Sequence, residues 1–410
     1  MTISECADPW PSHPWHPGPL ASHITWFAER LAEQGYAPFT THEKLRLVMH
    51  LSQWLQEQHV GADALDEPCI GQFLQYRQQQ GRAPRHHRVT LRTFLTELRD
   101  AGMLPVPARQ DSALDVLVHA FDDYLTSARG LARITREHYC PIVRRFLQER
   151  FGAGPLVLHA LGLHDMTQFL LRQAVTVSPR HAQSIVSALR TFCRFLVQRG
   201  DMSADLAAAI PAVADWRLAT LPKALAPAQV TQLLQSCNQD HPTGQRDYTI
   251  VLLMARLGLR PCEVVAMTLD DLDWEAGTLL VRGKGGRRDC LPLPQDVGQA
   301  VVTYLTDVRP RCATRRVFLR MKAPQCGFAN SVAICTIVRR ALERASLEPP
   351  CKGAHILRHS LATNLLHAGA SMVEISDVLR HRRPQTTEIY AKVDQATLGA
   401  LAQPWPGGAV

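Results

Sequence analysis

Basic and nucleophilic side chains stand in distinctive settings along the second half of the 410-residue chain. A phenol can act as a nucleophile, a guanidinium can hold an anion in a fork, and an imidazole can exchange a proton near neutral pH. The residues that carry these groups are Arg260, Lys284, His355, Arg358, His381 and Tyr390, and Glu263 supplies a nearby carboxylate. Such a set predicts chemistry at an anionic centre.

Short patterns place the first of these residues at a helix start and in a turn. Arg260 precedes a proline, which favours the first turn of a helix, and Glu263 follows at a spacing that lets its carboxylate brace the guanidinium. Residues 278–281 and 288–291 predict a strand pair. The glycines around Lys284 predict its turn, where the main chain can approach a phosphate closely.

The later residues fall in a helical pattern. His355 and Arg358 share one face of a predicted helix, and Tyr390 comes nine residues after His381. His355 and His359 also have the spacing of zinc ligands, but an isoleucine stands where H-E-x-x-H metalloproteases have glutamate. The chain contains neither a P-loop nor a G-x-G-x-x-G motif, so the sequence favours neither zinc proteolysis nor nucleotide binding.

The order of these features is more specific than any one of them. A lone arginine is commonly a surface ion-pair residue, and an isolated tyrosine is commonly a half-buried aromatic. The ordered set is R-x-x-E at 260–263, G-K-G at 283–285, H-x-L-R-H-S at 355–360, a further histidine, and I-Y at 389–390. It resembles the tyrosine recombinase (phage integrase) family, especially its bacterial Xer-like branch.

The resemblance covers residues 221–393 as a catalytic domain and residues 115–200 as the core-binding domain before it. It implies that Tyr390 attacks a DNA phosphodiester and keeps the 3′ phosphate, while Arg260 and Arg358 bind its non-bridging oxygens. His355 would then take and return the proton of the nucleophile, and Lys284 would protonate the departing 5′ oxygen. Because one ester replaces another, the scheme needs no ATP, metal or other cofactor.

Two features depart from the family pattern. Arg380 precedes His381, the residue that the resemblance assigns to hydrogen bonding with the phosphate, at a position where the family commonly has glycine. An arginine there adds positive charge beside the phosphate, or crowds the turn. The segment from residue 20 to 103 is additional to the usual two-domain plan. We expect it to bind DNA at arm sites or extra core sites, or to dock on another protein.

That additional segment is one copy of an internal repeat. Residues 72–74 recur as 168–170, residues 84–86 as 179–181 and residues 91–94 as 189–192, and the copies close with Gly102 and Gly200. The spacing of apolar residues predicts about four helices in each copy.

The fold class expected is therefore mainly α with a small β-sheet (α+β). Two tandem N-terminal helical, core-binding-like (SAM-like) domains precede a tyrosine recombinase catalytic domain. The predicted divisions are a flexible N-terminus (1–19), the first helical domain (20–105), the core-binding domain (112–204), a linker (205–222), the catalytic domain (223–402) and a loose tail (403–410).

The formal net charge of +8 suits a polyanionic partner such as DNA. For any single arginine, a solvated polar face is as good an interpretation as DNA contact. The DNA-binding candidates are Arg85, Arg88, Arg92, Arg180, Arg190, Arg287, Arg288 and Arg382.

The cysteines favour a reducing compartment. Eleven are scattered without a C-x-x-C pair, as in proteins whose thiols stay reduced. The N-terminus lacks the pattern of a signal peptide, and no apolar stretch of about 18 residues occurs. These features predict a soluble protein of a bacterial cytoplasm.

The resulting prediction is a site-specific recombinase that integrates, excises or transposes a mobile element, acting as a homo- or hetero-tetramer on double-stranded DNA. Two alternatives remain open: an accessory DNA-binding subunit that has lost the chemistry, and a type IB topoisomerase. Residues 394–402 form a short amphipathic segment that docks either on a neighbouring protomer or on its own domain.

Overall fold

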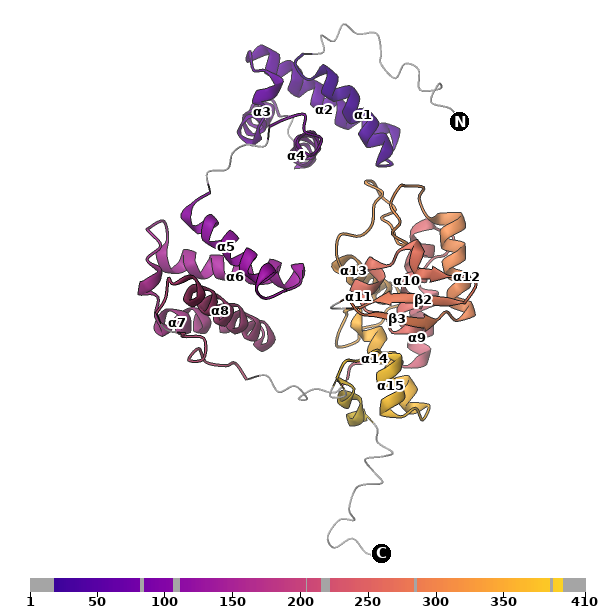
Figure 1. Ribbon diagram of the computed structural model, residues 1–410. Coiled ribbons are helices and arrows are strands. Elements are labelled where there is room, and N and C mark those ends of the chain that lie inside the picture. Colours follow the sequence, from indigo (N-terminus) through magenta and orange to yellow (C-terminus); the bar gives the residue numbers. More distant parts are fainter. Residues whose placement is uncertain are drawn as a thin grey trace, which may run out of the picture. The chain divides into compact units, whose positions relative to one another are not determined.

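The computed structural model describes residues 18–81, 85–105, 111–203, 205–214, 222–283, 286–383 and 386–393. These residues are mainly helical, with one three-stranded antiparallel sheet near the middle of the C-terminal part (Figure 1). The fold class predicted from the sequence is thereby confirmed. No helix among the described residues is long and apolar enough to cross a membrane.

The first repeat forms a bundle of helices around an aromatic core. Its elements are α1 (Ala21–Glu33), α2 (Pro38–Glu57), the 3₁₀ turn η2 (Ala62–Ala64), α3 (Glu67–Gln79) and α4 (Arg85–Asp100). The carboxylate of Asp66 caps α3 by accepting the Cys69 N–H at 2.8 Å. The rings of Phe27 and Phe94 pack edge to face where the helices meet, with their centroids 4.9 Å apart.

The second repeat forms a compact unit of its own with the same order of elements. They are α5 (Ala113–Ser127), α6 (Arg133–Phe151), the 3₁₀ turn η3 (Leu158–Ala160), α7 (Leu163–Ala174) and α8 (Pro179–Arg199). Ser112 and Asp115 form a capping box that starts α5.

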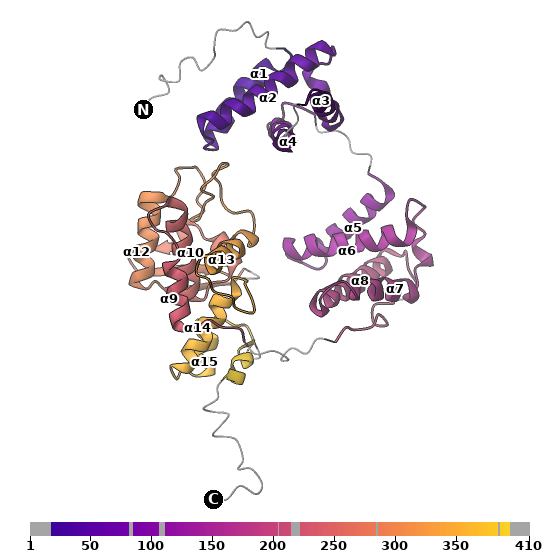
Figure 2. The ribbon, with the colours of Figure 1, turned by 180° about the vertical axis from the view of Figure 1, so that it is seen from behind.

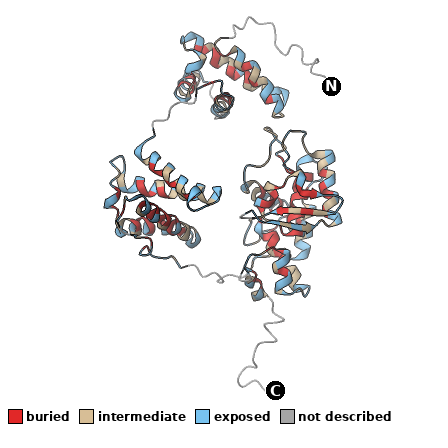
Figure 3. Ribbon diagram, in the orientation of Figure 1, coloured by how far each residue is buried: buried red, intermediate tan, exposed pale blue. Residues whose placement is uncertain are grey.

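Equivalent positions of the two copies have equivalent structural roles. Phe73 and Phe169 are both buried, as are Phe94 and Phe192. The burial colours of Figure 3 show buried faces turned into each bundle. The closing glycines, at residues 102 and 200, both have positive φ, +71° and +83°. The duplicated sequence therefore encodes a duplicated helical fold.

The range predicted as a linker, 205–222, begins with residues that pack on the second bundle. Ala207 and Ile210 are buried in that bundle's core, and Val213 packs against it. Residues 215–221 lie outside the described part of the chain.

The C-terminal part begins with helices and a small sheet. Its elements up to residue 308 are α9 (Pro227–Gln235), α10 (Pro242–Leu257), α11 (Pro261–Ala266), η4 (Leu269–Asp271), β1 (Leu272–Asp273), β2 (Thr278–Arg282), β3 (Arg288–Pro292), α12 (Gln295–Thr303) and the π-helical turn η5 (Tyr304–Val308). The strand order is β1-β2-β3, and Leu280 pairs with Cys290. The predicted hairpin is confirmed, although Lys284 and the next residue lie outside the described chain.

Helices complete the C-terminal part. They are α13 (Val332–Arg344), α14 (His355–His367), α15 (Met372–Val378) and the 3₁₀ helix η7 (Glu388–Val393). Views from opposite sides show α10 among α9, α12, α13 and α14, all of which it contacts (Figures 1 and 2). The buried side chains of Ile250, Leu253 and Met254 make α10 the central helix of this core. The C-terminal residues 394–410 lie outside the described chain.

Candidate active site

A glycine at the end of α10 turns the chain toward the site. Gly258 has φ +58°, in the left-handed region that favours glycine. A Cβ at this position would lie 2.9 Å from Leu379 Cδ2 and 3.0 Å from Leu361 Cδ2, so the space is also taken. The reversal brings Arg260 to the N-cap of α11, at the start of the helix that the sequence predicted.

Glu263 braces Arg260 in the way that their spacing predicted. Its Oε2 accepts the Arg260 backbone N–H at 2.8 Å, and its Oε1 accepts a guanidinium N–H of Arg260 at 2.8 Å. Glu263 is only 5% exposed, whereas a third of the Arg260 side chain remains accessible. The carboxylate thus holds the arginine from inside and leaves its outer edge open to a ligand.

Arg358 is buried where two helices end. On α14, it donates from its two terminal nitrogens to the Gly258 and Leu379 carbonyl oxygens. Those carbonyls close α10 and α15 and lack partners within their own helices. Burial, with the nearby cations of Arg260 and Arg380, lowers the pKa of Arg358 to about 10, so it stays charged at neutral pH.

Tyr390 lies on η7 with 1% of its surface exposed, packed against Ala362, Ile375 and Leu379. Its hydroxyl oxygen lies 2.9 Å from Nδ1 of His359, on α14. Burial raises the pKa of Tyr390 to about 12, although the charge of Arg358 acts in the opposite direction. The phenol is therefore protonated at neutral pH and needs an acceptor for its proton when it reacts.

His381 follows α15 and is half-buried. Its Nδ1 lies 2.8 Å from the Thr387 hydroxyl oxygen. Burial, together with the charges of Arg358 and Arg260, lowers the pKa of His381 to about 4. A neutral imidazole here can hydrogen-bond an anion without adding charge.

The structure gives less detail on the two remaining predicted catalytic residues, His355 and Lys284. His355 is the first residue of α14 and is exposed. Lys284 lies outside the described residues. The sequence patterns did not link His359 to Tyr390, because its spacing from His355 suggested only the spacing of zinc ligands. The signal was present in H-x-L-R-H-S, whose second histidine lies one helical turn after His355 and beside Arg358.

Arg380, the departure from the family pattern, is part of the same network. Its φ of +54° lies in the left-handed region, which accounts for a glycine being common there. Its guanidinium donates to Glu263 Oε2 at 2.9 Å and to the Leu257 carbonyl oxygen at 3.3 Å. The side chain points into the protein, and the arginine joins Glu263 to the end of α10.

Replacing Arg380 with glycine is expected to lower the free energy of unfolding by about 1–4 kcal/mol. Removing one partner of a buried ion pair costs about 3–5 kcal/mol, and relief of the left-handed backbone returns about 1–2 kcal/mol. Hydrogen exchange of the buried α10 amides measures the change. Ser346, an exposed residue with φ +53°, provides the control Ser346→Gly, which removes only backbone strain. Equal effects of the two glycine substitutions would show that the Arg380 ion pair contributes nothing.

The site carries excess positive charge. Three guanidinium groups, those of Arg260, Arg358 and Arg380, influence one another electrostatically, and Glu263 pairs two of them. Asp289 on β3 adds a negative charge near Arg380 but is itself paired with Arg287 at 2.6 Å. Burying like charges together is unfavourable unless an anion joins them. The arrangement therefore suits a phosphate group.

The candidate DNA-binding arginines are mostly at the surface. Arg190 differs, because it donates to the Ile210 carbonyl oxygen at 2.7 Å within its own bundle. The side chain of Arg85 lies outside the description. The exposed candidates are Arg88, Arg92, Arg180, Arg287, Arg288 and Arg382.

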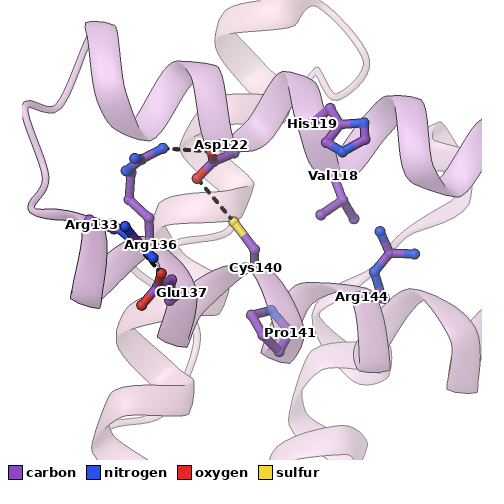
Figure 4. Close-up of a pocket in the computed structure, with 9 residues that line it drawn as sticks. All are labelled: Val118, His119, Asp122, Arg133, Arg136, Glu137, Cys140, Pro141 and Arg144. Atoms are coloured by element: carbon purple, nitrogen blue, oxygen red, sulfur yellow. Dashed lines mark hydrogen bonds and ion pairs between the residues drawn. The ribbon is translucent and has the colours of Figure 1, made fainter. Parts of the chain in front are cut away.

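A separate pocket of about 490 Å³ lies between α5 and α6 (Figure 4). In it, Asp122 accepts from Arg136 at 2.5 Å and lies 3.5 Å from the sulfur of Cys140. Burial, aided by Asp122, raises the pKa of Cys140 to about 12, so the thiol stays protonated and unreactive. Its charges are largely paired, and we assign this pocket no part in the chemistry.

Comparison with known proteins agrees with the arrangement. The model of the phage integrase family matches residues 223–397. The y4rA protein of Sinorhizobium fredii, whose name describes an integrase/recombinase, is 43% identical over 395 residues, which are 96% of each chain. The chain belongs to the phage integrase family. It is an Xer-like tyrosine recombinase.

Further relatives of the recombinase extend this result. Tyrosine recombinase XerD of Mycobacterium tuberculosis is 32% identical over 311 residues, which cover 72% of the recombinase and 97% of XerD. The crystal structure of XerH, a site-specific recombinase bound to a palindromic difH substrate after cleavage, shares the fold. Its TM-score is 0.56 at 19% identity, and the match covers 82% of the recombinase and 94% of XerH.

Proposed function

We propose that the recombinase cleaves and rejoins double-stranded DNA through a covalent bond between Tyr390 and a 3′ phosphate. The observation that carries this proposal is the grouping of Arg260, Arg358 and His381 with the Tyr390 phenol, in a site whose positive charge exceeds that of its carboxylate. A nucleophile and an anion receptor then occupy one site, as phosphoryl transfer to a side chain requires.

Arg260, Arg358 and His381 would stabilise the negative charge that builds on the phosphate in the transition state. Two of the five N–H donors of Arg358 hold helix-end carbonyls, which leaves three for the non-bridging oxygens. Arg260 presents its open edge to the same group, and His381 adds a neutral hydrogen bond. Because the protein holds these donors in place before the reaction, little reorganisation opposes the transition state.

The bonds exchange one for one. The Tyr390 oxygen forms a bond to phosphorus as the bond to the 5′ oxygen breaks, and that oxygen takes a proton from Lys284. An imidazole on α14 accepts the proton of the phenol, a role that the family resemblance assigns to His355. Attack by a second 5′ hydroxyl reverses each step. The ester bond is conserved, so the exchange needs no external energy source.

Double-stranded DNA is the partner that we propose, with a tetramer of recombinases assembled on it. The exposed arginines of α4, α8 and the β2–β3 hairpin would contact the phosphates and so position the duplex. Integration, excision or transposition of a mobile element in a bacterial cytoplasm is the proposed setting. We propose DNA contact or protein docking for the additional first bundle.

Covalent trapping tests the proposal. The full chain would be incubated in EDTA with nicked duplexes taken from the DNA that flanks its own gene, then run on denaturing gels. We expect an adduct that survives denaturant, because a nick lets the cleaved strand diffuse away before rejoining. Binding without an adduct would overturn the proposal in favour of an accessory DNA-binding protein. Relaxation of supercoiled plasmid without strand exchange would favour a topoisomerase.

A further inference from the structure

The imidazole at the Tyr390 hydroxyl is that of His359. Its Nδ1 lies 2.9 Å from the phenol oxygen, and the two rings are 5.7 Å apart between centroids. A proton acceptor must lie within hydrogen-bond distance of the proton that it takes, and this geometry meets the condition. The family resemblance assigns the role of proton acceptor to His355, which lies one turn earlier on the same helix and is exposed.

We propose that His359 is a catalytic residue of the recombinase, which accepts the Tyr390 proton at Nδ1 during cleavage and returns it during rejoining. The inference rests on Tyr390 being the nucleophile. The Tyr390 oxygen forms its bond to phosphorus as its proton passes to Nδ1, and the departing 5′ oxygen is protonated separately. In the reverse step, Nδ1 gives the proton back as the phenol leaves.

The surroundings of His359 keep its imidazole ready to accept. Burial lowers the pKa of His359, and the neighbouring His355 and Arg358 lower it further, so the ring is neutral at neutral pH. A neutral imidazole carries one N–H, and placing it on Nε2 leaves Nδ1 as the acceptor for the phenol. The groups that face it are His355 and Arg358 of α14, Tyr390 of η7, and His381 after α15.

The phenol needs such an acceptor. With a pKa of about 12, only about 1 in 10⁵ Tyr390 side chains carries a phenolate at pH 7. The same apolar packing that raises this value excludes water from the hydroxyl. His359 already contacts the hydroxyl within this packing, so the phenol can lose its proton to the imidazole before the Tyr390 ring becomes exposed to solvent.

Replacing His359 with asparagine tests the proposal, because an asparagine amide can still hydrogen-bond near the Nδ1 position but cannot take up a proton. We expect cleavage of nicked DNA at pH 7 to fall by about 10²- to 10⁴-fold, the usual contribution of a general base. DNA binding in a mobility-shift assay should be unchanged. His367→Asn, an exposed substitution at the other end of α14, is the matched control and should leave cleavage intact.

The pH profile separates proton transfer from positioning. Wild-type cleavage should fall as pH drops through the lowered pKa of His359, since the protonated ring cannot accept. In His359→Asn, the rate should instead rise about tenfold per pH unit, because only the phenolate reacts. Near-normal cleavage by His359→Asn would reduce its role to positioning. Loss of the acidic limb in His355→Asn alone would return the role to His355. Either outcome overturns the proposal.

A measurement without DNA keeps this inference distinct from the proposed function. In the full chain with ¹⁵N-labelled histidine, NMR should show Nδ1 of His359 as the unprotonated nitrogen, with a resonance that shifts in Tyr390→Phe. A proton on Nδ1 would overturn the proposal even if the wild type forms adducts. If the wild type forms no adduct on bound DNA, the proposed function fails, and the NMR result still reports on the contact.

Discussion

Tyr390→Phe is expected to abolish the covalent protein–DNA adduct while leaving the protein folded and able to bind DNA. Phenylalanine keeps the ring that packs against Ala362, Ile375 and Leu379, so the local core is preserved. The lost hydrogen bond to His359 costs about 1 kcal/mol, too little to unfold a domain. With no oxygen to attack phosphorus, the adduct should fall below detection on denaturing gels.

Tyr304 supplies the matched control. It is fully buried in the same C-terminal part, and its hydroxyl oxygen accepts the Leu319 N–H at 3.2 Å. Burial raises the pKa of both tyrosines, so Tyr304→Phe makes the same chemical change in a similar setting. It should retain cleavage. Undiminished adduct in Tyr390→Phe would place the nucleophile elsewhere, and mass spectrometry of the DNA-linked peptide would locate it.

The parts of the site that the sequence predicted are those built from local patterns. Arg260 and Glu263 are three residues apart across a helix start, so their contact follows from helix geometry. The β2–β3 hairpin follows from two short apolar runs around glycines. The helical repeat could be recognised because the two copies keep their core residues, such as Phe73 and Phe169.

The contacts that escaped prediction join residues far apart in the chain. His359 and Tyr390 are separated by 31 positions, and their meeting depends on how η7 packs on α14. The ion pair between Arg380 and Glu263 joins residues 117 positions apart. It also requires Arg380 to adopt a left-handed backbone conformation, which is uncommon for arginine.

Composition also misled where local packing decided the outcome. The Ala- and Pro-rich stretch after residue 204 has the character of a linker, yet Ala207 and Ile210 fill the second bundle's core. The same segment explains Arg190, since the Ile210 carbonyl that accepts its hydrogen bond comes from this stretch. A basic residue on a helix of this repeat therefore need not face a phosphate.

The second large effect is expected at Arg358. Arg358→Lys should lower DNA cleavage by about 10²- to 10³-fold, a loss typical of removing one preorganised donor group from a transition state. A single ammonium cannot span the Gly258 and Leu379 carbonyls and also reach a phosphate, as the guanidinium fork can. Arg358→Ala should lose more activity and also stability, because both carbonyls would lack a charged donor. Single-turnover cleavage and hydrogen exchange measure the two effects.

Arg256→Lys, made at an exposed arginine paired with Asp296, is the control and should cleave normally. The pH dependence then shows why arginine is needed. Burial and two neighbouring cations lower the pKa of Arg358 to about 10, which leaves it charged. The ordinary pKa of lysine is lower than that of arginine, and the same surroundings would lower it further. The Arg358→Lys variant should therefore lose the charge at this position, and with it cleavage activity, as pH rises through that lowered pKa. Cleavage by Arg358→Lys at the wild-type rate at every pH would refute the need for a guanidinium at this position.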